Sequence, residues 1–360
     1  MNTLTAIIIT KNEEKNIEDC LKSIIPFCDE IVINDTGSTD KTTEIIDTLR
    51  RTIPEFGIIN IYQNGWEDDF ALARNQAIEH ATSDWIIWID ADDRVPQTEI
   101  EKIKKLKTAP TERFFSLKIT NTAKGLPVKA QWMQVRMFPN IPQARFEGPI
   151  HETVKENLIN AGLMPRLVDV NIYHTGYEDP TLKSTKIQRN SKIFESIPNP
   201  SLRLIVHHAK NIAGPQNYDK SITLISHVLG KLNRETDYSL YNECLSLLGL
   251  YFYGKNDFEK AISYFEKMNK PSIQSHYIRA RCFEELKDFD KAVNGYLEVI
   301  DMEEQVSYTV STSHECKTYA YSFALRMLTA FGKYDKAAQL ITIISKKPGF
   351  EFMPVEHDRS

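Results

Sequence analysis

The stretch of sequence best suited to chemistry is the acidic run Asp90-Ala91-Asp92-Asp93, which directly follows the apolar segment Trp85–Ile89. Two carboxylates separated by one residue at the end of a strand can face the same crevice. Carboxylate oxygens are hard ligands that suit Mg²⁺ or Mn²⁺, and such a cation neutralises a diphosphate. A lone Asp-x-Asp is a weak signal, and the alternative is a solvated acidic turn that caps the next helix. The position after a hydrophobic strand favours a metal site.

Polar residues also follow two earlier apolar segments. Thr10-Lys11-Asn12-Glu13 comes after the β-branched run Ala6–Ile9 and could line a crevice with backbone groups. Asp35 ends a second such run, where it could accept hydrogen bonds from a base or a ribose. Gly37, in the turn that follows, permits close backbone approach. The alternative for this turn is an ordinary helix cap.

A third polar cluster begins a helix, in the run Phe70-Ala71-Leu72-Ala73-Arg74-Asn75. Arg74 and Asn75 are flanked by small residues, and a guanidinium is well suited to planar or anionic ligands. Alternatively, Arg74 pairs with a neighbouring acid.

These clusters sit within an alternation of strand and helix patterns over the first hundred residues. Short β-branched runs predict strands, and apolar residues three or four apart predict the helices between them. The predicted strands are 6–10, 30–35, 57–62 and 85–90, and the predicted helices are 17–25, 41–51 and 69–81. This rhythm predicts an α/β fold with a doubly wound, mostly parallel sheet. Ligands bind beyond the carboxyl ends of the strands in such sheets, which is where the polar clusters lie.

The pattern changes between residues 113 and 174. Strands are predicted at 114–120, 131–138 and 167–173, joined by loops that contain proline and glycine rather than by clear helices. We interpret them as a mixed extension of the same sheet. After Pro180 the strand patterns fade and helices predominate.

The C-terminal part contains an internal repeat of the pattern aromatic–acid–Lys–small, with separations of 40, 31 and 45 residues. The four copies are Tyr218-Asp219-Lys220-Ser221, Phe258-Glu259-Lys260-Ala261, Phe289-Asp290-Lys291-Ala292 and Tyr334-Asp335-Lys336-Ala337. Each copy begins a predicted helix, in which the small residue lets two helices approach. The pattern resembles degenerate tetratricopeptide repeats, which stack helix pairs around a surface for protein or peptide. The alternative is a plain helical bundle.

Composition narrows the class of protein. At 360 residues the chain exceeds one ordinary core, so two domains are expected. A formal net charge of -5 does not fit a nucleic-acid binder. We expect no membrane span, because no apolar run approaches about 18 residues. Five scattered cysteines without a Cys-x-x-Cys pair, and a chain that begins directly in a strand, favour the cytoplasm.

Taken together, the motifs resemble a family 2 glycosyltransferase of the GT-A fold. The matching segments lie in the family's order and cover roughly residues 1–180; they are 7–14, 34–40, 70–75 and 88–93. Two later segments, Phe146–Glu152 and Ile172–Tyr177, are similar to a bacterial branch in which helical repeats follow the transferase domain. That branch includes the glycocin S-glycosyltransferases, which glycosylate a peptide cysteine. The expected organisation is a catalytic domain at 1–180, a linker helix at 181–200 and a repeat domain at 201–360.

The resemblance implies a nucleotide-sugar donor, a UDP-sugar, and Mn²⁺ or Mg²⁺ as cofactor. It places Asp35 near the nucleobase, Asp90 near the ribose or sugar, and Asp92 on the metal. The residues expected to bind the donor are Thr10, Asn12, Glu13, Asp35, Arg74, Asp90, Ala91, Asp92, Lys186 and Arg189.

The remaining roles follow from side-chain chemistry. His174 ends a predicted strand, and a neutral imidazole is a good metal ligand beside an Asp-x-Asp carboxylate, although a buried histidine with hydrogen bonds is the alternative. Glu152 is the candidate general base that takes the acceptor's proton in an inverting transfer. His151 could do this instead, or orient Glu152. Lys186 and Arg189 could clamp the diphosphate.

The residues and the family resemblance together predict a metal-dependent, inverting hexosyltransferase that uses UDP-glucose to modify a peptide or protein, and the resemblance makes a cysteine thiol the candidate acceptor. A homodimer is expected from the repeats and from the resemblance. An alternative within the enzyme class is transfer to a lipopolysaccharide or other glycan. A non-catalytic scaffold and a nucleotidyltransferase are further alternatives; the second normally has a Gly-rich, basic loop after its first strand, whereas residues 10–14 offer none.

Overall fold

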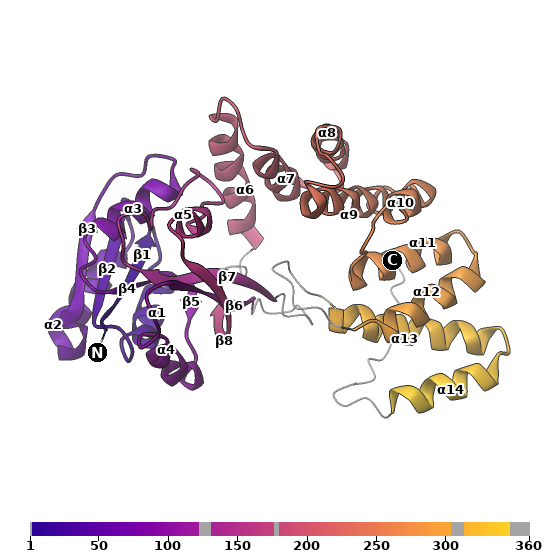
Figure 1. Ribbon diagram of the computed structural model, residues 1–360, viewed down its shortest axis with the longest axis horizontal. Helices are drawn as coiled ribbons and strands as arrows, with labels where there is room; N and C mark the ends of the chain where they lie inside the picture. Colours follow the sequence, from indigo (N-terminus) through magenta and orange to yellow (C-terminus); the bar gives the residue numbers. More distant parts are fainter. Residues whose placement is uncertain (1, 122–130, 176–179, 304–312, 346–360) are drawn as a thin grey trace. The chain divides into compact units, whose positions relative to one another are not determined.

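The fold is described from a computed structural model, which covers residues 2–121, 131–175, 180–303 and 313–345 (Figure 1). Its contacts divide the chain into two compact units at the bond between Ile197 and Pro198. The predicted boundaries at 180 and 200 stay a prediction; the observed division falls within the segment predicted as a linker. The helix α6 (Pro180–Glu195) belongs to the first unit.

The first half of the first unit is a parallel sheet. Its strands are β1 (Leu4–Thr10), β2 (Glu30–Asp35), β3 (Ile59–Gln63) and β4 (Trp85–Asp90), in the order β3-β2-β1-β4. The connections contain α1 (Ile17–Ile24), α2 (Thr42–Thr52), the 3₁₀ helix η1 (Pro54–Ile58) and α3 (Phe70–Glu79). These elements confirm the predicted alternation, and all three strand pairs are parallel.

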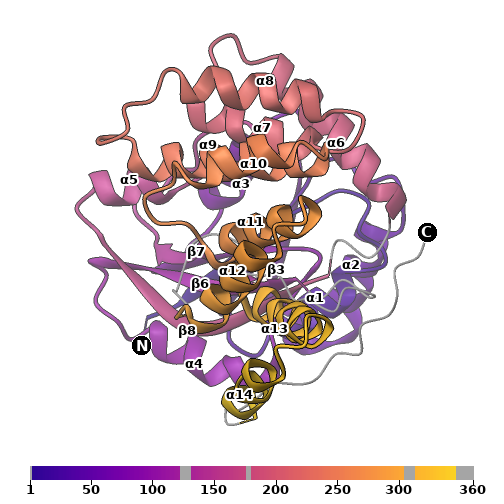
Figure 2. The same cartoon turned by 90° about the vertical axis from the view of Figure 1, so that its right-hand side faces the viewer.

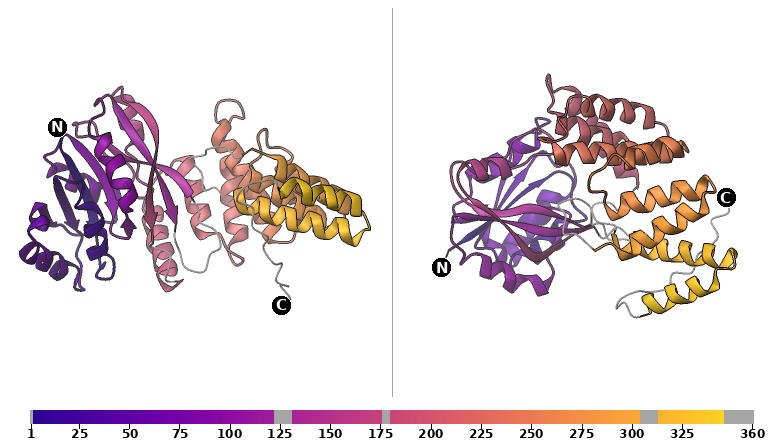
Figure 3. Two further views of the ribbon diagram at one scale, coloured as in Figure 1. Left: turned by 90° about the horizontal axis from the view of Figure 1, so that it is seen from below. Right: turned by 45° about the vertical axis from the view of Figure 1, so that its right-hand side comes forward.

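Alternate residues of these strands enter two separate cores, as a sheet with helices on both faces requires. Ile8 and Ile87 belong to one core together with Leu21 of α1. Ile7 and Trp88 belong to the other, where Ala77 of α3 packs. The doubly wound arrangement is therefore confirmed, and the twisted sheet with its flanking helices is visible in Figure 3.

The second half of the sheet is mixed, as expected. β7 (Gln131–Pro139) pairs antiparallel with β4 and with β6 (Arg113–Asn121), and β6 pairs parallel with β8 (Met164–His174). The full order is β3-β2-β1-β4-β7-β6-β8-β5, where β5 is the two-residue strand Asp93–Arg94. Two helical segments follow β5, namely η2 (Gln97–Glu99) and α4 (Ile100–Leu106). A short helix that the sequence did not predict, α5 (Lys155–Asn160), lies between β7 and β8.

The second unit contains only helices among its described residues. They are α7 (Leu202–Ile212), α8 (Tyr218–Leu229), α9 (Tyr238–Gly254), α10 (Phe258–Phe265), α11 (Ile273–Glu285), α12 (Phe289–Asp301), α13 (Ser313–Ala330) and α14 (Tyr334–Ile344). Each of the four tetrapeptide copies begins a helix, at α8, α10, α12 and α14. Figure 2 shows α11, α12 and α13 packed side by side.

The helix pairs are built on a recurring turn. Asn256, Lys287 and Gly332 each have a positive φ, and each lies two residues before the aromatic residue that begins the next helix. The residue after each one donates its backbone N–H to a carbonyl five residues earlier, at 2.8 to 2.9 Å. This left-handed residue and backward hydrogen bond end one helix and start its partner. The small residue of each tetrapeptide is buried, which confirms its expected packing role.

Candidate functional site

Four side chains with possible metal ligands meet at the carboxyl end of β4. Ligand atoms of Asp90, Asp92, Asp93 and His174 all lie within 4.8 Å of one another. Sheet register explains the meeting, because β5 pairs antiparallel with the end of β8 and sets Asp93 opposite His174. The structure therefore brings the predicted metal ligands Asp92 and His174 together. It adds Asp93, which belongs to the acidic run but had no predicted role of its own.

Asp93 is the most buried member of the cluster, with no exposed surface. Its Oδ2 accepts from Arg136 Nη1 at 2.8 Å and from the backbone N–H of Asp90 at 2.9 Å. Its Oδ1 lies 2.9 Å from Nδ1 of His174. Both carboxylate oxygens therefore have strong partners within the protein.

Asp92 is in the opposite situation. Its side chain is 11% exposed and lies 3.3 Å from His174 Nδ1 and 3.8 Å from Lys186 Nζ. Within the part of the chain that the structure describes, no residue donates a short hydrogen bond to this carboxylate. Burial raises the pKa of Asp92, and this effect together with the charges of Asp90 and Asp93 outweighs the opposite effect of His174 and Lys186. A buried carboxylate with little compensation and an imidazole beside it fit a divalent cation in their donor chemistry.

His174 is held by the surrounding acids. Burial alone would lower the pKa of His174, but the hydrogen bond to Asp93 and the charges of Asp92 and Asp90 outweigh it, so the pKa is raised. A metal competes with a proton for an imidazole. Binding of a cation at this site is therefore expected to weaken as the pH falls.

Arg74 connects the acid cluster to the candidate base. Its Nη2 donates to Asp90 Oδ1 at 2.9 Å, and its Nε donates to Glu152 Oε1 at 2.7 Å. The side chain is only 5% exposed, and its guanidinium lies over the Trp88 ring, 4.1 Å from the centroid. Burial would raise the pKa of Asp90, yet the charges of Arg74 and Arg136 hold it well below its ordinary value. The sequence alternative, in which Arg74 pairs with an acid, describes its contacts in this structure.

Arg136 was missed by sequence reasoning. It lies on β7, is 1% exposed, and places its guanidinium 3.6 Å from the centroid of the Trp88 ring. Its Nη2 is 3.5 Å from Asp90 Oδ2. One signal could have identified it: an arginine beside the apolar pair Met137-Phe138 in a predicted strand needs a buried acidic partner.

The loop before α5 presents Glu152 and His151. Gly148 and His151 both adopt positive φ values, and residues 147 and 153 close the loop through an isolated antiparallel bridge. Asn75 of α3 anchors the start of the loop, because its side-chain amide exchanges two hydrogen bonds with the backbone of Phe146. Glu152 is thereby directed inward to Arg74, while His151 is exposed.

Residues at the ends of β1 and β2 form hydrogen bonds with one another. Asp35 is 2% exposed, and its two oxygens accept from Thr10, from the backbone N–H of Gly37, and from the backbone and hydroxyl of Ser38. Asn12 has a positive φ and accepts from the backbone of Thr39 through its Oδ1. These contacts fit the turn-and-cap alternative, and the donor-binding roles of Thr10, Asn12 and Asp35 stay predictions.

Glu13 and Ala91 follow the adjacent strands β1 and β4. Burial raises the pKa of Glu13, and the charges of Asp92 and Asp90 act in the same direction. Ala91 is 3% exposed, in the turn between β4 and β5. Their contacts with a donor stay predictions.

One face of α6 carries three cations at three-residue spacing. Lys186 approaches Asp92, the guanidinium of Arg189 lies 4.8 Å from the Phe70 ring centroid, and Lys192 pairs with Asp68 at 2.9 Å. The structure thus places Lys186 and Arg189 beside the acid cluster and the start of α3. The motif residues Gly176 and Tyr177 lie outside the described residues.

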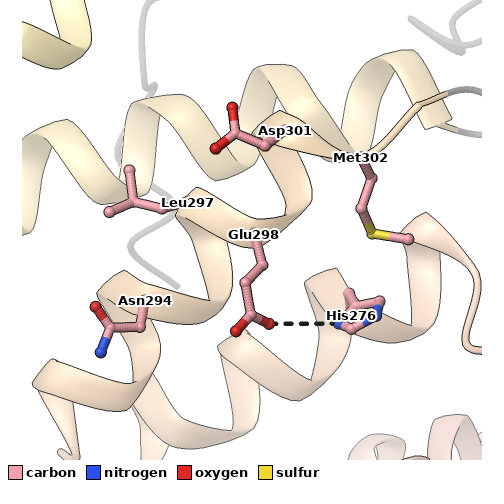
Figure 4. Close-up of a pocket in the computed structure, with 6 residues that line it drawn as sticks. All are labelled: His276, Asn294, Leu297, Glu298, Asp301 and Met302. Atoms are coloured by element: carbon pink, nitrogen blue, oxygen red, sulfur yellow. Dashed lines mark ion pairs between the residues drawn. The ribbon is translucent and has the colours of Figure 1, made fainter.

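A separate hollow lies in the second unit, between α11 and α12 (Figure 4). It is lined by His276, Asn294, Leu297, Glu298, Asp301 and Met302. His276 Nδ1 is 3.7 Å from Glu298, which also pairs with Arg279 at 3.0 Å. Burial and the charge of Arg279 lower the pKa of His276.

Comparison with known proteins finds a family match within the first unit. Residues 5–138 match the family model described as glycosyl transferase family 2. The chain therefore carries a family 2 glycosyltransferase domain, and its GT-A-like α/β fold followed by helices is confirmed. None of the helices in the described ranges is both long and apolar enough to cross a membrane.

Three curated relatives share parts of the chain. The SPbeta prophage-derived glycosyltransferase SunS of Bacillus subtilis is 33% identical over 199 residues, which are 54% of this chain and 45% of SunS. A TPR repeat-containing protein of Synechococcus elongatus is 31% identical over 159 residues, 44% of this chain and 37% of the relative. The lipopolysaccharide core biosynthesis glycosyltransferase LpsC of Rhizobium meliloti is 33% identical over 109 residues, 30% of this chain and 38% of LpsC. The chain thus spans less than half the length of each.

Among solved structures, residues 1–349 of TarS from S. aureus in complex with UDP-GlcNAc align over 82% of this chain and 90% of that chain. The TM-score is 0.42 and the identity 14%.

Proposed function

We propose that this chain is a metal-dependent, inverting glycosyltransferase that transfers a hexose, glucose from UDP-glucose, to a side chain of a peptide. One arrangement supports it above all: a poorly compensated carboxylate, Asp92, lies beside His174 and Lys186 at the carboxyl end of β4. That edge of a parallel sheet is where nucleotides bind. The family 2 match over residues 5–138 supports a sugar donor.

In the proposed reaction, Asp92 and His174 hold the cation. A bound Mn²⁺ or Mg²⁺ supplies charge stabilisation for the departing diphosphate. Lys186 and Arg189 of α6 contact the phosphates, since both are cationic and lie along the same edge of the site.

Glu152 takes the proton of the acceptor as the acceptor attacks the anomeric carbon. Arg74 fixes this carboxylate at 2.7 Å and joins it to Asp90, which contacts the sugar or ribose. His151 is the other candidate base, from the same loop. A thiol acceptor makes a modest demand on either, because a cysteine with a pKa of about 8.5 is already a few per cent thiolate at neutral pH.

The peptide acceptor is supported by the helix-pair repeats of the second unit, since stacked repeats form surfaces that bind peptides. Similarity to SunS and the resemblance to glycocin S-glycosyltransferases support a cysteine. We also propose a homodimer, which sedimentation at several protein concentrations would test.

A second candidate, transfer to a lipopolysaccharide or other glycan, is favoured by the similarity to LpsC. In that case the repeats serve only as an oligomerisation surface.

The donor and metal can be tested together by a thermal-shift screen. UDP-glucose, UDP-N-acetylglucosamine, UDP-galactose and GDP-mannose are each added with Mn²⁺, with Mg²⁺ and with EDTA. We expect UDP-glucose to raise the melting temperature of the protein only when a metal is present. Equal shifts with EDTA would contradict the metal, and a shift with GDP-mannose alone would contradict the donor.

The acceptor is tested by mass spectrometry after incubation with UDP-glucose, metal and small cysteine-containing peptides. We expect an added hexose on a cysteine peptide and none on its matched Cys-to-Ser version. Modification of both peptides would indicate that a hydroxyl oxygen can also serve as the acceptor atom. A product on an added glycan, with both peptides unmodified, would favour the second candidate.

A further inference from the structure

We propose that Asn34 is a positioning residue for the candidate base Glu152, an inference that rests on the proposed function, in which Glu152 takes the proton of the acceptor. Asn34 lies on β2, directly before Asp35, and is 1% exposed. Its side chain acts on Glu152 through α3. It holds this helix against the sheet, and the helix holds the loop that carries Glu152.

The side-chain amide of Asn34 joins α3 to the ends of two strands. Its Nδ2 donates to the backbone carbonyl of Ala73 at 2.8 Å and to Gln76 Oε1 at 3.0 Å, both on α3. Its Oδ1 accepts from Nδ2 of Asn64, the residue after β3, at 2.8 Å. Both amide hydrogens and the amide oxygen are therefore engaged, which fixes the orientation of the side chain.

Packing alone fixes α3 weakly. Its buried apolar residues are three alanines and one isoleucine, namely Ala71, Ala73, Ala77 and Ile78. Alanine side chains form shallow ridges, so a helix that packs through them can slide or rotate with little change in its contacts. Hydrogen bonds resist such movement because they are directional. Asn34 therefore sets the rotation of α3 and its position along the helix axis.

The first two turns of α3 in turn hold the loop before α5. The backbone N–H of the first residue of α3 donates to the carbonyl of Pro149 at 2.9 Å. Arg74 Nε donates to Glu152 Oε1 at 2.7 Å. Asn75 exchanges two hydrogen bonds with the backbone of Phe146, at 2.9 and 2.8 Å. A shift of α3 is therefore passed on to Glu152.

Such a shift would move the base relative to the donor. In the proposed reaction the cation and the diphosphate are held by Asp92, in the turn after β4, whereas Glu152 is held from α3. A displacement of about 1 Å at the reacting groups can lower a rate about 100-fold. Loss of the Asn34 hydrogen bonds should therefore lower kcat and leave the KM for the donor nearly unchanged.

Asn34→Leu tests this role, because it keeps the branched shape of the side chain and removes its hydrogen bonds. The Phe146 N–H donates to Asn75 Oδ1, so its hydrogen exchange, followed by NMR, reports on the attachment of the loop to α3. We expect exchange about tenfold faster in the variant. The second measurement is release of UDP from UDP-glucose with Mn²⁺, in which water replaces the acceptor. We expect kcat to fall about 100-fold and the KM for UDP-glucose to stay within about twofold.

Asn140→Leu is the matched control. The Nδ2 of Asn140 donates to the carbonyls of Ala81 and Ser83 at 3.0 Å each, in the same unit but just before the start of β4, at the opposite end of this strand from the site. It should lower the melting temperature as Asn34→Leu does. The exchange of the Phe146 amide and kcat should both stay within about twofold of the wild type.

Gln76→Leu is a milder variant that keeps the proposal testable if Asn34→Leu does not fold. It removes one of the two acceptors of Asn34 Nδ2 and leaves the bond to Ala73. We expect faster exchange of the Phe146 amide and a lower kcat, each changed less than in Asn34→Leu.

The inference is overturned if the Asn34 and Gln76 variants exchange the Phe146 amide and release UDP like the wild type. It is also overturned if Asn140→Leu changes both quantities as much as Asn34→Leu. A raised KM for UDP-glucose with an unchanged kcat would place the effect of Asn34 on the donor and would equally contradict it. If the wild type releases no UDP, the proposed function fails, and the exchange of the Phe146 amide still decides whether Asn34 holds the loop.

Discussion

Removal of the Arg74 guanidinium should destabilise the first unit by several kcal/mol. Arg74 is 5% exposed, and it pairs with Glu152, which is 12% exposed, and with Asp90, which is 28% exposed. Arg74→Met keeps much of the packing against Trp88 but leaves Glu152 without its ion-pair partner and Asp90 with Arg136 alone. Breaking a buried ion pair in this way costs about 3–5 kcal/mol. We expect a loss in this range for the free energy of unfolding of the first unit.

The chain offers a convenient probe and control for this measurement. All four tryptophans, at positions 66, 85, 88 and 132, lie in the first unit, so tryptophan fluorescence during urea unfolding reports on that unit alone. Arg50→Met is the matched control, since Arg50 forms an exposed pair with Asp47 at 3.5 Å. Such pairs contribute at most about 1 kcal/mol.

The double variant Arg74→Met with Glu152→Gln separates the cost of leaving a buried carboxylate unpaired from the cost of lost packing. Removing the charge of Glu152 should restore part of the loss, with a coupling energy of about 0.5–3 kcal/mol. The reasoning is refuted if Arg74→Met costs no more than Arg50→Met, or if the double variant is less stable by the sum of the two single losses.

Three other changes test separate parts of the structure. Gly249→Ala should destabilise the second unit by about 1–3 kcal/mol, because a Cβ at this position would lie 2.5 Å from the buried Phe265 ring. Urea unfolding followed by circular dichroism would measure the loss. Gly230→Ala is the control and should be nearly neutral, because its Cβ would make no contact under 3.5 Å. Burial lowers the pKa of His276, so the folded state favours its neutral form, and the second unit should lose stability as the pH falls below about 6.5. His276→Asn should reduce the slope of stability against pH by at most about 1.4 kcal/mol per pH unit, and an unchanged slope would contradict the expectation. The pKa of His174 is raised, so Mn²⁺ affinity should fall as the pH drops through that raised value, a decline that calorimetry between pH 6 and 8.5 would detect and that a flat profile would exclude.

Local sequence patterns predicted most of the framework. The runs that end at Asp35 and Asp90 are strands with those same ends, because short β-branched segments between turn residues have few other ways to fold. The aromatic–acid–Lys–small copies begin helices for a similarly local reason. Each follows a tight turn, and in α10 and α12 the preceding Asp257 and Asp288 accept a helix N–H.

The contacts that organise the site depend on long-range pairing, which local patterns do not contain. Arg136 reaches Asp93 only because β7 pairs antiparallel with β4, and nothing near either residue specifies that partner. His174 meets the acids through the short β5–β8 pairing. For Asp35 the sequence suggested contact with a base or ribose because of its residue type and its place at a strand end. In the structure its own turn supplies enough hydrogen-bond donors to occupy both of its oxygens.

The central claim is that a cation held by Asp92 assists departure of the nucleoside diphosphate from the sugar. Asp92→Ala should leave the fold intact, since it removes a buried carboxylate whose pKa is raised by burial and by neighbouring charge. The decisive measurement is release of UDP from UDP-glucose by the wild type and by Asp92→Ala, each with Mn²⁺ and with EDTA. We predict that the wild type releases UDP with Mn²⁺ and not with EDTA. Asp92→Ala should release no UDP, although it melts no lower than the wild type. Normal turnover by Asp92→Ala, or equal turnover of the wild type in EDTA, would contradict the claim.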